Sequence, residues 1–243
     1  MKKFIACVII LLIASGAVFF FGWTQFKVGA DSCGVLVSKT GGVNSEPVLP
    51  GKFSWHWECL LPTNATLKIF STKPHVVSKT ASGDLPSADV YGSMFDVAPN
   101  FSYRFDFMMT CRVASENIIE LIRDGLVADD ESLDAYIDSS CASLASKAAS
   151  HILTKSFEDS SFRSESLTTS ELLSLVNAAK DFPHIDFTHF AVTASRIPDS
   201  MLYTRARELF LEVHKFEVKE SERNKRMSEL LNELQQLSSG TES

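Results

Sequence analysis

The sequence predicts an α+β protein. We expect an antiparallel sheet with helices packed on it, between an N-terminal transmembrane helix and a C-terminal amphipathic or coiled-coil helix. Apolar and polar residues alternate from Phe101 to Val113, which is typical of a strand with one buried and one solvated face, and such sheets are usually antiparallel. Beyond residue 115 the apolar residues recur every three to four positions, which indicates amphipathic helices. The chain also begins with an apolar run long enough to cross a membrane.

This uncharged run extends from Phe4 to Phe26, directly after Lys2 and Lys3. As a helix it would be about 35 Å long at ~1.5 Å per residue, enough to cross a hydrocarbon core of ~30 Å. The two lysines place the N-terminus in the cytoplasm by the positive-inside rule. The chain is then a single-pass inner membrane protein, with its body in the periplasm or an equivalent compartment. The anchor is predicted at residues 1–26, with lipid-facing positions that include Phe4, Leu12, Phe20 and Trp23.

A cleaved signal peptide is the alternative to this anchor, because Ala14-Ser15-Gly16 resembles a small-residue cleavage site. Cleavage there would leave the apolar stretch 17–23 at the new terminus, which favours the uncleaved anchor. Both alternatives export the body of the protein.

The exported body is predicted to be one domain over residues 27–198, strand-rich at 33–113 and helical at 115–198. A helix with heptad spacing follows at 199–237, and a polar tail at 238–243. The expected strands are 34–39, 52–60, 65–71, 76–80, 90–97, 101–113 and 185–196. The expected helices are 116–126, 132–157 and 169–180, and the last of these starts with the capping-box pair Thr168 and Glu171.

The order of these elements resembles a known family. A Gly34-Val35 strand is followed by Pro50-Gly51 and an aromatic-rich segment, Phe53–Trp57, and the domain ends in a strand, a proline and a helix rich in Ala, Arg and Glu. This order resembles the band 7 or SPFH domain of stomatins, prohibitins and flotillins, over roughly residues 23–225. The exported topology is most similar to the bacterial HflK/HflC type. That resemblance implies lateral assembly into a ring and a membrane AAA protease as a partner, whereas the short C-terminal helix does not match a closed cage.

Composition and motifs argue against several other functions. A net charge of −7 gives no basic surface, so nucleic acid is not expected as a partner. The sequence contains no GxSxG, HExxH, P-loop, GxGxxG or CxxC motif, and its 6 histidines are scattered over different predicted elements. We therefore expect no catalytic site, no metal, no cofactor and no enzymatic activity. An exported hydrolase with a site assembled from distant residues is the least favoured alternative.

Four cysteines lie beyond the anchor, and an oxidising compartment would allow them to pair. A hairpin centred on Glu46 would place Cys33 opposite Cys59. Cys111 is on the apolar side of its strand and Cys141 on the apolar stripe of its helix, so these two would meet in the core. Buried free thiols are the alternative for both pairs.

The C-terminal helix carries apolar residues in a four–three alternation over about five heptads, interrupted only by Glu220 and Arg223. Such a pattern requires a partner helix. A helix that folds back onto its own domain is the alternative for the first half, whereas no predicted domain remains to cover the half beyond Arg223. Ala206 belongs to the alternation, and the predicted oligomerisation positions are Leu202, Leu209, Val213, Phe216, Met227, Leu230, Leu234 and Leu237.

Together these expectations describe a membrane-anchored, SPFH-like scaffold. It would assemble laterally into a ring or microdomain through contacts with lipids and with copies of itself or related subunits, and would organise membrane protein partners. The alternative is an accessory interaction subunit of a larger membrane machine, such as a secretion or motility apparatus, that forms no ring of its own. An oligomer that persists without other proteins would discriminate between the two.

Overall fold

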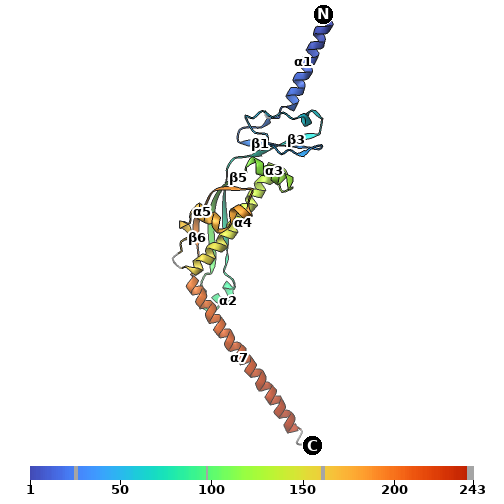
Figure 1. Cartoon of the computed structure of the whole chain (residues 1–243). Coiled ribbons are helices and arrows are strands. Elements are labelled where there is room, and N and C mark those ends of the chain that lie inside the picture. Colours follow the sequence, from blue (N-terminus) through green and yellow to red (C-terminus); the bar gives the residue numbers. More distant parts are fainter. Residues whose placement is uncertain (25–26, 97, 160–161, 240–243) are drawn as a thin grey trace. The chain divides into compact units, whose positions relative to one another are not determined.

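A computed structural model of the chain shows helices and strands along most of its length (Figure 1). It describes residues 1–24, 27–96, 98–159 and 162–239, with side chains as far as residue 232. The chain divides into two compact units. Unit 1 comprises residues 1–81, 105–152 and 163–194, and unit 2 comprises residues 82–104, 153–162 and 195–243. Each unit is therefore built from three separate segments of the chain.

Helix α1 (Lys2–Gly22) is the apolar segment at the N-terminus. It is long and apolar enough to cross a membrane, and it is the one helix of this kind among the described residues. A signal sequence has the same length and composition. Phe4, Leu12 and Phe20 are exposed along its length, as lipid-facing positions require.

The first sheet of unit 1 has the antiparallel strand order β2-β1-β3. Its strands are β1 (Ser32–Ser38), β2 (Gly42–Val43) and β3 (Ala65–Ser71). The turn between β1 and β2 uses a positive φ of 71° at Gly42, a conformation that glycine adopts without strain. This tight turn pairs Val37 with Val43, and Cys33 lies opposite Phe70 on β3. The predicted hairpin that would join Cys33 to Cys59 is therefore wrong.

The strand expected at 52–60 is also wrong. This segment contains an isolated bridge between Trp55 and Trp23, followed by the 3-10 helix η2 (Trp57–Leu60). The aromatic residues that suggest a strand instead contact the end of α1, where the rings of Phe53 and Phe19 stack with their centroids 5.9 Å apart. Packing against α1 thus outweighs the β propensity of the segment.

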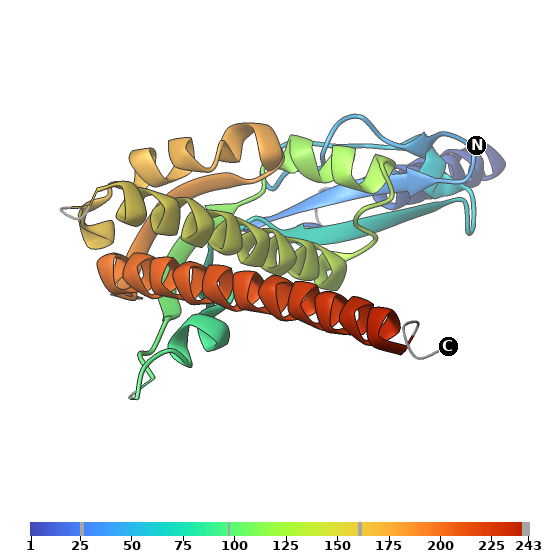
Figure 2. The same ribbon diagram turned by 90° about the horizontal axis from the view of Figure 1, so that it is seen from below.

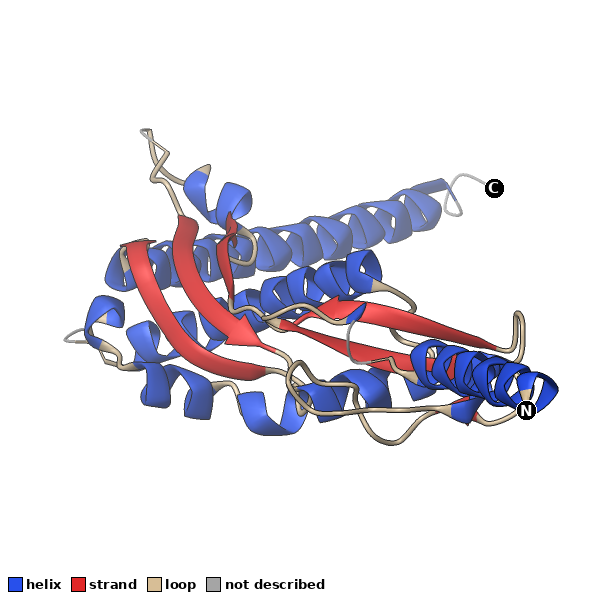
Figure 3. Ribbon diagram, turned by 90° about the horizontal axis from the view of Figure 1, so that it is seen from above, coloured by secondary structure: helices blue, strands red, loops and turns tan. Residues whose placement is uncertain are grey.

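A second sheet brings together strands from distant parts of the sequence (Figure 3). Its order is β4-β5-β6, with β4 at His75–Asp84, β5 at Ser102–Arg112 and β6 at Asp186–Arg196. The Thr188 hydroxyl donates a hydrogen bond to the carbonyl of Thr110, and the Thr193 hydroxyl donates to that of Asp106. From the first bond to the second, the residue number on β6 rises from 188 to 193 while the residue number on β5 falls from 110 to 106. The two strands therefore run antiparallel.

The core of unit 1 lies between this sheet and two helices, α3 (Ser115–Arg123) and α4 (Asp130–Glu158). The alternation predicted for β5 and the apolar stripe predicted for the long helix are both confirmed. The residues concerned are at most 1% exposed: Phe105, Phe107, Met109 and Cys111 on β5, and Leu133, Ile137, Cys141, Leu144, Ala148 and Ile152 on α4. The alternating residues of β5 and the apolar stripe of α4 therefore face the same core.

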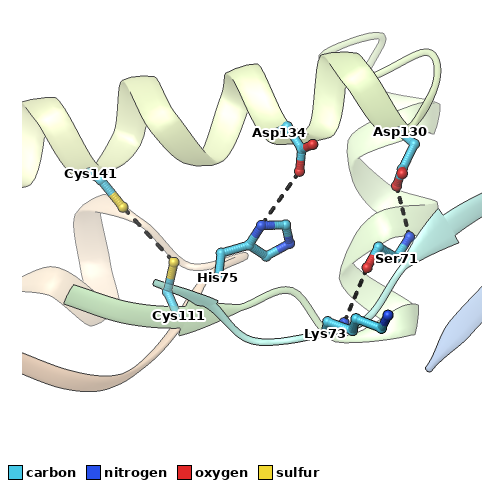
Figure 4. A network of polar contacts seen from close by, with 7 residues as sticks. All are labelled: Ser71, Lys73, His75, Cys111, Asp130, Asp134 and Cys141. Atoms are coloured by element: carbon cyan, nitrogen blue, oxygen red, sulfur yellow. Dashed lines mark hydrogen bonds and ion pairs between the residues drawn. The ribbon is translucent and has the colours of Figure 1, made fainter. Parts of the chain in front are cut away.

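Polar contacts also connect α4 to β3 and β4 (Figure 4). Three carboxylates at four-residue spacing share one face of α4. They contact three residues that are also four apart: the Ser71 N–H donates to Asp130 Oδ1 at 2.7 Å, His75 Nδ1 lies 3.5 Å from Asp134 Oδ1, and Lys79 Nζ lies 2.6 Å from Asp138 Oδ1. An ion pair with an exposed carboxylate, such as Lys79 with Asp138, contributes only ~0.2–1 kcal/mol, so these contacts align the strand with the helix more than they stabilise the unit.

The helix expected at 169–180 is divided in two. It consists of α5 (Thr169–Leu175) and α6 (Ala178–Asp181), separated by Asn177, whose φ of 51° ends one helix and starts the next. The predicted start of α5 is confirmed, because Thr168 and Glu171 form a reciprocal capping box. A short 3-10 helix, η3 (Ser164–Ser166), precedes it.

Unit 2 contains the connection between β4 and β5 together with helix α7 (Ser200–Ser239). The connection includes α2 (Ala88–Gly92), so the strand expected at 90–97 is wrong. Tyr91 of α2 lies against Tyr203 of α7, with ring centroids 5.6 Å apart, and this tertiary contact outweighs the local β propensity. Leu85, Phe101 and Ala206 form the buried cluster of the unit.

Candidate assembly surface

Helix α7 starts at a side-chain cap. Asp199 follows Pro198 directly, and its Oδ1 accepts hydrogen bonds from the backbone N–H groups of Met201 and Leu202, each 2.9 Å long. A carboxylate at this position satisfies otherwise unpaired N–H groups and fixes the first turn. From there α7 continues as one helix to Ser239 (Figure 2).

One stripe of α7, the docked stripe (Tyr203, Ala206 and Phe210), attaches the start of the helix to unit 2. Ala206 is completely buried. The rings of Tyr203 and Phe210 lie 5.6 and 5.5 Å from the ring of Tyr91, and the Tyr203 hydroxyl donates a 2.7 Å hydrogen bond to the carbonyl of Pro86. Partial burial raises the pKa of Tyr203, so its hydroxyl stays a donor at neutral pH.

A second stripe, the seam, is exposed on the same helix. We define it as Leu202, Leu209, Val213, Phe216, Met227 and Leu230. These side chains are between 37% and 73% exposed. At ~100° per residue, the seam lies about 90° around the helix from the docked stripe. Contact with unit 2 therefore uses a face of α7 other than the seam.

One residue, Ala206, differs from the predicted assembly pattern, and two others are not tested. Ala206 belongs to the four–three alternation in sequence, but it is buried in unit 2 rather than exposed with the seam. Leu234 and Leu237 lie outside the residues whose side chains the structure describes. Glu220 and Arg223, which interrupt the alternation, are both exposed.

The distal part of α7 has no cover from unit 2. Every side chain from Leu211 to Asn232 is exposed. The exposed apolar side chains of the seam in this part of the helix, which are Val213, Phe216, Met227 and Leu230, mark a candidate interaction site. A helix more than five turns long without tertiary contacts also gains little stability by itself, so a partner would stabilise it.

Leu211 and Val218 are exposed apolar residues of α7 that the four–three alternation does not include. Each is 44% exposed. They are seven residues apart and lie nearly opposite the seam, at ~100° per residue. Their spacing is the signal that could have identified them. Apolar residues on two opposed sides allow one helix to contact a neighbour on each side.

An aromatic collar (Trp23, Phe53, Trp55 and Trp57) surrounds the C-terminal end of α1. The rings of Trp23 and Phe53 lie 6.0 Å apart, and the Trp55 ring approaches Gly22 so closely that a side chain there would collide with it. Phe53, Trp55 and Trp57 are between 38% and 57% exposed. Exposed aromatic residues at the end of an apolar helix are typical of a membrane–water interface. The sequence alone places Trp23 and Phe26 at this interface, and Phe26 lies outside the residues that the structure describes.

The four cysteines beyond α1 are all free thiols. Cys33 is completely buried on β1, whereas Cys59 is partly exposed in η2, and burial raises the pKa of both thiols. Cys111 and Cys141 lie together in the core of unit 1, with their sulfur atoms 3.9 Å apart (Figure 4). The structure thus brings together the second pair of cysteines that the sequence suggests.

Among the described residues, no group of three or more His, Cys, Asp or Glu side chains is arranged to hold a metal ion. Unit 1 has a hollow of about 570 Å³ beside α5, α6 and β6, lined largely by apolar groups such as Phe182, Ile185 and Phe187. Neither observation assigns a reaction to the chain. The surfaces of α7 and the end of α1 are therefore the most informative features for function.

Comparisons with known proteins add one relative. No family model matches the chain. Over 206 residues the sequence is 28% identical to an uncharacterized protein of Treponema pallidum (strain Nichols), and the match covers 83% of this chain and 68% of the relative.

Proposed function

We propose that the chain is a membrane-anchored scaffold that assembles laterally through α7, as its resemblance to the SPFH domain implies. The observation that carries this proposal is the separation of two stripes on one helix. The docked stripe holds the start of α7 on unit 2, while the seam remains available along most of its length. A helix that served only to complete its own domain would not need the second stripe.

The membrane end of the protein supports lateral assembly. In the proposed topology, α1 crosses the inner membrane with its N-terminus in the cytoplasm, and the aromatic collar sets the height of the body at the interface. All copies are then confined to one plane, which raises their effective concentration and makes weak lateral contacts sufficient. The opposed residues Leu211 and Val218 favour an array or ring over an isolated pair, because each helix then contacts two neighbours.

The partners of such a scaffold follow from the resemblance. They are membrane lipids, further copies of the chain or related subunits, and membrane proteins such as an AAA protease that the assembly would hold or regulate. No catalytic residue, metal or cofactor is part of the proposed function.

The proposal is tested by Phe216→Asp combined with Leu230→Asp, which places two charges in the seam. Burying a large apolar side chain contributes ~1.5–3 kcal/mol, so loss of two per subunit should convert the detergent-extracted assembly into protomers. The matched control is Ser221→Asp with Ser228→Asp, which adds the same charges away from the seam, on the side of the docked stripe but beyond its end. Particle size is measured by light scattering, and folding of both units by circular dichroism.

The two stripes make the outcome of this experiment decisive. If the control stays assembled while the seam variant dissociates and remains folded, α7 is the assembly element. A seam variant of unchanged size would overturn the proposal for α7. A wild-type chain that is already a protomer without other proteins would favour the accessory subunit of a larger machine.

A further inference from the structure

The thiols of Cys111 and Cys141 form a contact that the proposed scaffold function does not use. Cys111 comes from β5 and Cys141 from α4, they are 30 residues apart in sequence, and both are completely buried. Their sulfur atoms are 3.9 Å apart, which is close to van der Waals contact (Figure 4). A disulfide requires about 2.05 Å, so the two sulfur atoms have to move closer together for the bond to form.

In the folded unit the two thiols interact directly with each other. The hydrogen bond from the Cys141 thiol lowers the pKa of Cys111, and the same bond raises the pKa of Cys141. Cys33 has no such neighbour on its strand, because its partner position on β3 is occupied by Phe70.

We propose that Cys111 and Cys141 form a disulfide that joins β5 to α4 in the exported protein. This inference rests on the proposed export of the body, because disulfides persist in an oxidising compartment. The oxidant is the disulfide of a thiol-oxidising protein. Since neither thiol is accessible in the folded unit, the reaction takes place as the chain folds, before α4 covers β5.

The reaction is thiol–disulfide exchange in two steps. The thiolate of one of the two cysteines attacks one sulfur of the oxidant's disulfide, which forms a mixed disulfide and releases one oxidant thiolate. The other cysteine then loses its proton to water and attacks the sulfur of the first, which forms the intramolecular S–S bond and releases the second oxidant thiolate. The two cysteines are oxidised by two electrons in total, and the oxidant is reduced to a dithiol.

The test traps the thiol state of the full-length protein in its native cells. Acid quenching and denaturation are followed by alkylation with iodoacetamide, and then by reduction and labelling with N-ethylmaleimide. Tryptic peptides 105–112 and 124–147, which carry Cys111 and Cys141, are expected to take the second label only. Peptides 28–39 and 53–68, which carry Cys33 and Cys59, are expected to take the first and serve as internal controls.

A second measurement compares thermal unfolding with and without reductant. Cross-linking a loop of this length should raise the midpoint of the wild-type protein by on the order of 10 °C, and the shift should persist in Cys33→Ser. It should be absent in Cys111→Ser with Cys141→Ser. If both core cysteines of the wild-type protein are labelled by iodoacetamide, the proposed disulfide is wrong. If a reporter fused after Ser243 shows at the same time that the body is exported, the proposed topology stands and only the disulfide fails.

Discussion

The hydroxyl of Tyr203 donates a 2.7 Å hydrogen bond to the backbone carbonyl of Pro86, 117 residues earlier in the sequence. This bond connects α7 to the start of the segment between β4 and β5. The Tyr203 ring also makes edge-on contacts with Tyr91, Phe101 and Phe157, at centroid distances between 5.3 and 5.7 Å. One side chain thus fixes the rotation of α7 about its own axis within unit 2, and that rotation leaves the seam exposed.

The first prediction separates the hydrogen bond of Tyr203 from its ring contacts. Tyr203→Phe should lower the free energy of unfolding by about 0.5 kcal/mol, because the bond is exposed to solvent and the ring remains. Tyr203→Ala should cost about 2–3 kcal/mol, because the aromatic contacts are lost as well. Thermal unfolding of the purified protein measures both values, with Tyr136→Phe on α4 as the control. Equal effects of the Phe and Ala variants would show that the ring does not hold α7.

Sequence periodicity correctly predicted strand β5 and helix α4, which pack against each other. The alternation on β5 and the stripe on α4 describe opposite sides of one core, so each pattern correctly identifies the residues that are buried. The capping box at Thr168 was equally clear, because it depends only on residues three positions apart. Local and tertiary requirements agree at these places.

Sequence patterns do not reveal the places where side chains pack against an element that is distant in the sequence. Trp55 and Phe53 have a high β propensity, but they pack at the end of α1, and Tyr91 lies in a short helix because α7 offers it an aromatic contact. Asn177 breaks a helix that its neighbours would continue. Helix α7 gives another example. The heptad pattern includes Ala206, but only the tertiary structure shows that this residue is buried against unit 2. A period shows that a face is apolar without showing what covers it.

The second prediction concerns the dependence of stability on pH at Asp181. Lys147 Nζ donates a 2.6 Å hydrogen bond to Asp181 Oδ2, and this bond lowers the pKa of the carboxyl in the folded protein. A depressed pKa contributes stability that is complete above the unfolded value of ~3.9 and is lost as the pH falls through the folded value. Asp181→Asn should therefore lower the unfolding midpoint at pH 7 and have a diminishing effect below about pH 3.9.

Lys147→Met is the matched test of the same interaction. It should remove the same pH-dependent difference, and the double variant should show no further loss. A midpoint difference that stays constant from pH 7 to about pH 2 would exclude the ion pair as its cause.

The third prediction places the aromatic collar at the lipid interface. In vesicles with lipids brominated near the headgroup, fluorescence of single-tryptophan variants that retain Trp23 or Trp55 should be strongly quenched. Lipids brominated near the end of the acyl chain should quench less, because interfacial tryptophans remain near the headgroups. A tryptophan introduced at Met227, on the exposed part of α7, is the control and should not respond to either lipid. Equal responses at all three sites would contradict the proposed position of the collar.

The last prediction uses the two charged residues that interrupt the seam. Glu220 and Arg223 occupy positions of the four–three alternation and are exposed, so an assembled seam has to bring their charges next to a neighbouring helix. Replacing both with leucine should extend the apolar seam without interruption, with a gain of ~1.5–3 kcal/mol for each side chain that becomes buried. The assembly should then resist dissociation at higher detergent concentrations. The matched control, Ser221→Leu with Ser228→Leu, adds the same side chains away from the seam and from the opposed residues Leu211 and Val218. If both variants increase particle size equally, the effect is nonspecific association. If only the seam variant does so, the neighbouring helix contacts this face of α7.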